Sequence, residues 1–98
     1  MAKGRIYIVE DEAIIAMDLR DRLVAQNWEV VGLAFSAEQA LPEIAALQPD
    51  LVLMDIILAG GMDGIEAAAE IARRHEIPTI YITANADPAT LQRAKLTE

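Results

Sequence analysis

Acidic side chains follow two of the apolar runs in this 98-residue sequence. Residues 5–9 (RIYIV) lead directly into Glu10 and Asp11, and residues 51–54 (LVLM) lead into Asp55. Short apolar runs bounded by turn residues are typical of strands that are buried on both faces. A carboxylate at the end of such a strand is costly unless water, a partner group or a cation stabilises it. These acids are therefore the first candidates for chemistry.

A structural interpretation of the same residues is also open. Asp11 or Glu12 can cap a helix that begins directly afterwards, because acids favour helix N-termini. Asp55 can belong to the turn that follows it, where residues 60–64 (GGMDG) are typical turn residues. Capping accounts for one or two of the three consecutive acids, and the residues around Asp55 alone do not decide between the two interpretations.

The elements that must position these acids alternate regularly along the chain. Such an alternation, with short connections, predicts a parallel α/β sheet with helices on both faces and right-handed crossovers. No linker, internal repeat or low-complexity segment interrupts the pattern, so we expect one domain over residues 1–98. Apolar runs predict strands at 5–9, 29–35, 51–55 and 79–83, and periodicity with start signals predicts helices at 13–26, 37–48, 64–74 and from Asp87 onward.

Two of the predicted helices carry more detailed signals. In the helix at 37–48, Ser36 and Gln39 match a capping box, while Pro42 lies past the first turn and predicts a kink or a late start. The helix at 13–26 has apolar residues at four-residue steps, which predicts the stripe that packs on the sheet. That stripe consists of Ile15, Leu19 and Leu23, widened by Ile14, Met17 and Val24.

The composition excludes several kinds of site and partner. The chain has no cysteine, which excludes disulfides and thiolate metal sites, and its single histidine, His75, cannot form a histidine cluster and is expected at the surface. A net charge of -8 argues against direct binding to nucleic acid or to anionic membranes. No apolar run reaches the roughly 18 residues of a membrane span, and the N-terminus has no secretory signal, so we expect a cytoplasmic protein.

The acids are expected to meet at one edge of the sheet. In a parallel sheet the carboxyl ends of all strands point to the same edge, where ligands bind in open α/β folds. If the first and third strands are neighbours, Glu10, Asp11 and Asp55 converge there, beside Thr83 at the end of the fourth strand. Three carboxylates raise one another's pKa or recruit a divalent cation, and an oxygen-only set suits Mg²⁺ or Mn²⁺. Since Mg²⁺ also favours phosphate, and a carboxylate can accept a phosphoryl group, this edge suggests phosphoryl transfer.

Three segments connect the sequence to a known family. They are IVEDE (8–12), LMDIILAGGMDG (53–64) and ITA (82–84), in this order and at the predicted strand ends. Together they closely resemble the receiver domain of bacterial two-component response regulators, over residues 5–98. The resemblance implies a three-layer, flavodoxin-like fold whose parallel sheet has the strand order 2-1-3-4-5.

The resemblance also implies roles for the acids. Asp55 is then the phosphoacceptor. Mg²⁺ is bound directly by Asp11 and Asp55 and by the backbone carbonyl of Ile57, while Glu10 acts mainly through a metal-bound water. The domain would catalyse its own Mg²⁺-dependent phosphorylation without being an enzyme in the usual sense.

Other implied roles concern the phosphoryl group and the partners. Thr83 would hydrogen-bond the phosphoryl group, and the small Ala84 would leave room for it. The apolar Ile57 cannot orient an attacking water, which predicts slow hydrolysis of the acyl phosphate. The implied partners are a histidine kinase or phosphotransfer protein as donor, and a C-terminal effector domain or a downstream protein as target.

The family pattern continues with parts that residues 1–98 do not contain. These parts are a fifth strand with a lysine at its end, an aromatic switch residue on that strand, and a fifth helix; Lys95 does not match the position of that lysine. We therefore expect a fragment or a shortened receiver. Without the fifth strand and helix, the fourth strand would be an exposed edge and the helix at 13–26 would lose a neighbour. This predicts either a homodimer that covers the edge or a parent chain whose remainder is present but disordered.

Alternative functions remain at this stage. The missing lysine favours a receiver fold that binds partners without being phosphorylated. An aspartyl phosphatase or phosphotransferase is disfavoured, because the first strand ends in Glu10, Asp11 and Glu12 and not in Asp-x-Asp. A flavin site is disfavoured because acids stand where a Ser/Thr/Gly-rich loop is needed.

Overall fold

Strands and helices alternate in a computed structural model of the chain, which describes residues 3–56, 58 and 61–82. Every predicted boundary within these residues is correct to within one residue, whereas Thr83 and the helix predicted from Asp87 lie outside them. The elements are β1 (Arg5–Val9), α1 (Ala13–Ala25), β2 (Glu29–Ala34), α2 (Ala37–Leu47), β3 (Leu51–Asp55), α3 (Gly64–His75) and β4 (Thr79–Ile82). None of these three helices is long and apolar enough to span a membrane.

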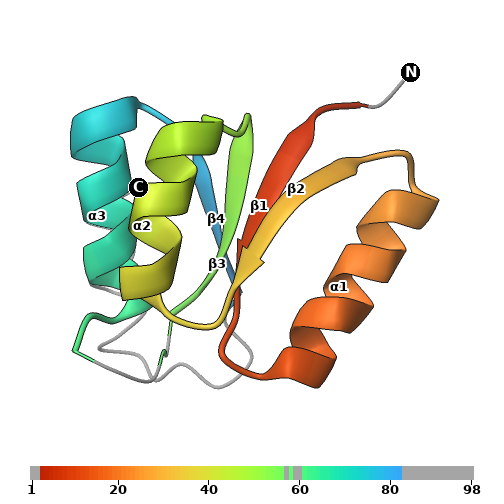
Figure 1. Ribbon diagram of the computed structural model, residues 1–98, viewed down its shortest axis with the longest axis horizontal. Helices are drawn as coiled ribbons and strands as arrows, with labels where there is room; N and C mark the ends of the chain where they lie inside the picture. The colour runs from red at the N-terminus through yellow and green to blue at the C-terminus, as the bar shows by residue number, and fades with distance from the viewer. Residues whose placement is uncertain (1–2, 57, 59–60, 83–98) are drawn as a thin grey trace.

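The four strands form one parallel sheet in the order β2-β1-β3-β4. Helix α1 lies on one face of the sheet, and α2 and α3 lie side by side on the other (Figure 1). The expected three-layer fold and the order 2-1-3-4 are confirmed, and the described residues contain no fifth strand. β1 and β3 are neighbours, which is the condition on which the convergence of the acids depended.

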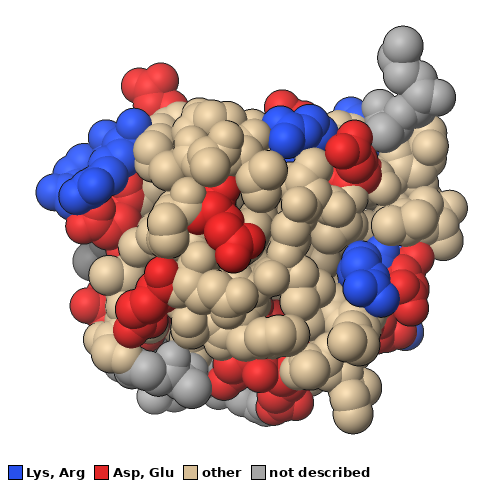
Figure 2. Space-filling view, viewed as in Figure 1, with Lys and Arg blue, Asp and Glu red and all other residues tan. Residues whose placement is uncertain are grey.

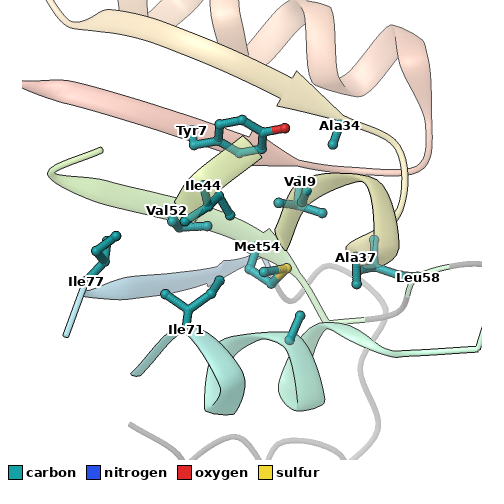
Figure 3. Close-up of a cluster of buried hydrophobic side chains, with 12 residues drawn as sticks. Tyr7, Val9, Ala34, Ala37, Ile44, Val52, Met54, Leu58, Ile71 and Ile77 are labelled. Carbon is teal, nitrogen blue, oxygen red and sulfur yellow. The ribbon is translucent and has the colours of Figure 1, made fainter. Parts of the chain in front are cut away.

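The main core fills the space between the sheet and the α2–α3 layer. Tyr7 and Val9 of β1, together with Val52 and Met54 of β3, point to this side, where they meet Ile44 of α2 and Ile71 of α3 (Figure 3). Because side chains alternate along a strand, the intervening Ile6 and Ile8 face the α1 side, and both are buried. The apolar run at 5–9 is therefore buried on both faces, as predicted.

A bulge sets the register between β1 and β2. Ile6 pairs with Val30, but Tyr7 pairs with Gly32, so one residue of β2 is left over. A Cβ on Gly32 would overlap the Tyr7 ring, whose hydroxyl donates a 2.8 Å hydrogen bond to Glu43 Oε1 on α2. After the bulge, Val9 pairs with Ala34, which brings the end of β2 level with the end of β1.

Helix α2 matches its sequence signals in part. Ser36 Oγ accepts the Gln39 N–H at 3.1 Å, as a capping box requires, but Gln39 Oε1 accepts from Phe35 N–H at 3.3 Å, one residue before the cap. The helix begins at Ala37 and continues through Pro42, so the late start is wrong. A proline costs a helix one hydrogen bond, and here the first turn, with its cap, forms ahead of it.

Helix α1 packs on the sheet differently from its predicted stripe. Its buried residue is Ala16, Leu19 and Leu23 are half-buried, and Ile15 is 42% exposed. The small Ala16 lets the helix axis approach β1 and β2, and the larger side chains then flank the contact instead of filling it. The prediction is therefore wrong for Ile15 and for the residues that were to widen the stripe. The latter stay exposed: Ile14 at 85%, Met17 at 47% and Val24 at 55%.

Candidate functional site

Three carboxylates meet at the carboxyl edge of the sheet. Val9 pairs with Met54, so the next residues of the two strands, Glu10 and Asp55, lie side by side. Asp11 follows one residue later. One carboxylate oxygen from each of Glu10, Asp11 and Asp55 lies within 4.8 Å of the others. The sheet thus brings together three of the residues that the sequence singled out.

Glu10 is the buried member of this cluster, with 3% of its surface exposed. Its Oε1 accepts the Glu12 N–H at 3.1 Å, and its own N–H donates to the Ala34 carbonyl at 3.0 Å. Burial raises the pKa of Glu10 from 4.5 to about 7; the Glu12 hydrogen bond opposes this rise, and the charge of Asp55 adds to it. Metal-free Glu10 therefore keeps its proton to a higher pH than an ordinary glutamate does.

The chain that leaves Asp55 is held by its own backbone and by α3. The Gly64 N–H donates to the Ile56 carbonyl at 3.0 Å, and a Cβ on Gly64 would overlap the Asp55 carbonyl oxygen. Asp63 Oδ1 accepts from Glu66 N–H at 2.9 Å while Glu66 Oε1 accepts from Asp63 N–H at 3.2 Å, which completes a capping box. The composition of residues 60–64 indicates only a turn at Asp63, whereas the D-x-x-E spacing at 63–66 signals this box.

Three predicted site residues, Ile57, Thr83 and Ala84, lie outside the described residues. Their roles stay predictions. Asp55 pairs with Ile82 of β4, so the residue before Thr83 stands beside the candidate phosphoacceptor.

The donor set fits Mg²⁺. All three side chains offer carboxylate oxygens, the ligands that hard divalent cations prefer. Burial, and to a lesser degree the charge of Asp55, raises the pKa of Glu10 and so disfavours its ionised form. A divalent cation beside Glu10 would favour the ionised form.

Comparisons with known proteins identify the family. The response regulator receiver domain family matches residues 6–97. The transcriptional regulatory protein PdtaR of Mycobacterium tuberculosis is 41% identical over 92 residues, which are 93% of this chain and 44% of PdtaR. The phyllosphere-induced regulator PhyR of Methylorubrum extorquens is 40% identical over 81 residues, which are 81% of this chain and 30% of PhyR.

Solved structures agree with these sequence matches. The crystal structure of the signal receiver domain of a modulated diguanylate cyclase from Desulfovibrio desulfuricans superimposes with a TM-score of 0.91 and 38% identity, covering 96% of this chain and 75% of that chain. This chain spans less than half the length of PdtaR and of PhyR. Receiver domains generally bind Mg²⁺ through acidic residues, and this chain carries such a cluster. The chain belongs to the response regulator receiver domain family of two-component systems.

Proposed function

We propose that residues 1–98 form one receiver domain in which Asp55 accepts a phosphoryl group. The observation that carries this proposal is the position of Asp55: it ends β3 with its carboxylate beside those of Glu10 and Asp11, within 4.8 Å. In the proposed reaction an Asp55 carboxylate oxygen forms a bond to phosphorus while the bond between phosphorus and the donor breaks. Phosphoryl transfer depends mainly on the positioning of the reacting groups and on neutralisation of charge. The pairing of β1 with β3 supplies the positioning, because it sets Asp55 beside Glu10.

We assign Mg²⁺ to the same cluster. Asp11 and Asp55 would hold the ion directly together with the Ile57 carbonyl, and Glu10 would act mainly through a water molecule. When bound, the ion supplies neutralisation of the charge on the transferred group. Thr83 and Ala84 would contact the phosphoryl group, which their place directly after β4 supports.

The proposed partners follow from family membership. A histidine kinase or a phosphotransfer protein would donate the phosphoryl group in the cytoplasm, and an effector domain or a downstream protein would read the phosphorylated state. Direct nucleic-acid or membrane binding by this domain is not part of the proposal. On the face shown in Figure 2, Lys and Arg form small clusters next to acidic side chains and do not form a continuous basic surface.

A second candidate function is an interaction module that works without phosphorylation. The observation that favours it is the exposed apolar side of α1, where Ile14 and Val24 are 85% and 55% exposed. Such side chains suit a protein partner whatever the state of Asp55.

Phosphorylation by a small donor distinguishes the two functions. The full-length protein is incubated with acetyl phosphate and Mg²⁺, and intact mass together with hydroxylamine lability reports an acyl phosphate. We expect one phosphoryl group on the wild type, none on Asp55→Asn, and a normal result for Asp18→Asn, which removes an exposed acid from α1. Equal labelling of Asp55→Asn would show that another residue is the acceptor. A wild type that binds Mg²⁺ but is never labelled would support the interaction module.

A further inference from the structure

One hydrogen bond joins α2 to the segment that follows the phosphoacceptor strand. Glu38 Oε2 accepts the backbone N–H of Gly61 at 3.0 Å, across 23 positions of the sequence. We propose that Glu38 is a positioning residue for the acidic site: it anchors the β3–α3 segment and thereby holds the Asp55 end of the cluster in its metal-binding geometry. This inference rests on the proposed function of Asp55 and Mg²⁺.

On one side, Glu38 is tied to the β1 end of the cluster. It is the second residue of α2, and two residues separate the end of β2 from the start of this helix. The last residue of β2, Ala34, accepts the Glu10 N–H at 3.0 Å. Ser36 caps the helix between them, so the first turn of α2 has a defined position relative to Glu10.

On the other side, Gly61 belongs to the connection that begins at Asp55. The hydrogen bonds that hold the α3 end of this connection come from within the same stretch, namely Gly64 N–H to Ile56 and the Asp63–Glu66 box. Glu38 adds an acceptor from a different element. Two hydrogen bonds therefore link the two ends of the cluster through β2 and α2. Glu10 bonds to the end of β2, and Glu38 of α2 bonds to the segment that begins at Asp55.

The residue types fit this anchoring role. A carboxylate accepting from a backbone N–H makes a charge-assisted hydrogen bond, which is stronger than one between neutral groups. The contact does not require a glycine, since a Cβ at position 61 would stand 3.4 Å from Glu38 Oε2, an ordinary van der Waals distance. Glu38 is not among the three acids whose carboxylate oxygens converge within 4.8 Å, so its proposed effect passes through the backbone and not through direct coordination.

Two substitutions of Glu38 separate anchoring from charge. Glu38→Ala removes both the acceptor and the negative charge, whereas Glu38→Gln removes the charge and keeps a side-chain oxygen that can accept from Gly61. Glu29→Ala removes one exposed charge at the opposite end of the sheet and serves as the control. The readouts are amide hydrogen exchange of Gly61 in metal-free full-length protein, and the Mg²⁺ dissociation constant by calorimetry.

For Glu38→Ala we expect faster exchange at Gly61 and a Mg²⁺ dissociation constant raised about tenfold, the lower end of what supporting residues of metal sites typically contribute. Glu38→Gln and Glu29→Ala should stay within about twofold of the wild type, well below that range. The inference is overturned if Glu38→Ala matches the wild type, or if Glu38→Gln loses as much affinity as Glu38→Ala while Gly61 stays protected. If the wild type binds no Mg²⁺, the proposed function is rejected. The exchange rate of the Gly61 amide would then still show whether Glu38 holds the β3–α3 segment.

Discussion

Gly64 and Asp55 are in direct backbone contact: a Cβ on Gly64 would overlap the Asp55 carbonyl oxygen. The first residue of α3 thus touches the last residue of β3, which carries the candidate phosphoacceptor. Gly64→Ala must push α3 or the end of β3 out of place, and overpacking of this kind typically costs about 1–3 kcal/mol of unfolding free energy. We expect this loss in urea denaturation, together with weaker Mg²⁺ binding.

Gly61→Ala is the matched control for that substitution. It adds the same methyl group to the same connection, but the nearest atom, Glu38 Oε2, lies at 3.4 Å. Its unfolding free energy should change by no more than about 0.5 kcal/mol, as for an ordinary surface substitution. If Gly64→Ala were as stable as Gly61→Ala, the close contact with Asp55 would not constrain the site.

Magnesium should stabilise the folded domain through the acidic cluster. A ligand that binds only the native state at ten times its dissociation constant adds about 1.4 kcal/mol to the unfolding free energy. Asp11→Ala should lose most of the resulting rise in melting temperature. Its melting temperature without metal should equal or exceed that of the wild type, because one repulsion is gone. Asp18→Ala, on α1, should respond to Mg²⁺ like the wild type in differential scanning calorimetry, and a full response in Asp11→Ala would reject the site.

Glu10 makes the metal-free stability depend on pH. Its pKa is about 7 in the fold and 4.5 as the ordinary value, so between these pH values folded Glu10 keeps a proton that unfolded Glu10 has lost. The unfolding free energy therefore falls as pH rises through this range, and the penalty is complete above about pH 7. Denaturation in EDTA at several pH values measures this effect as the difference between wild type and Glu10→Gln. Parallel curves for the two proteins would contradict the raised pKa.

The exposed side of α1 should make the 98-residue chain a dimer. α1 carries Asp18, Asp21, Arg20 and Arg22 and is neutral, whereas the chain has a net charge of -8. Two negatively charged copies repel each other least where the surfaces that meet are neutral. The acidic and basic residues of α1 can also pair across a symmetric contact, beside its apolar residues. Light scattering should show a dimer for the wild type and a monomer for the double variant Ile14→Ser/Val24→Ser.

The control for this dimer is Phe35→Ser, which removes a side chain that is 40% exposed after β2 and outside α1. It should leave the dimer intact. A monomeric wild type, or a dimer that survives the double substitution, would show that α1 is not the contact between copies.

The positions of strands and helices, and the residues of the acidic cluster, could be predicted from the sequence because their signals are local. The run at 5–9 and the acids after it show a strand that ends in carboxylates, whatever the rest of the chain does. The Ser36 cap before α2 and the turn residues before α3 work in the same way, because each signal comes from residues that are close together in the sequence.

The tertiary structure decided what depends on distant neighbours. Periodicity predicts that Ile15 lies in the core. In the fold Ala16 is buried where α1 packs on the sheet, and Ile15 stays 42% exposed. Periodicity and spacing leave the adjacency of β1 and β3, which makes neighbours of Glu10 and Asp55, as a condition; only the family resemblance implies it. The hydrogen bond from Gly61 to Glu38 has no signature at all, because it joins a backbone amide to a carboxylate 23 positions away, and only the packing of α2 against the β3–α3 segment brings them within reach.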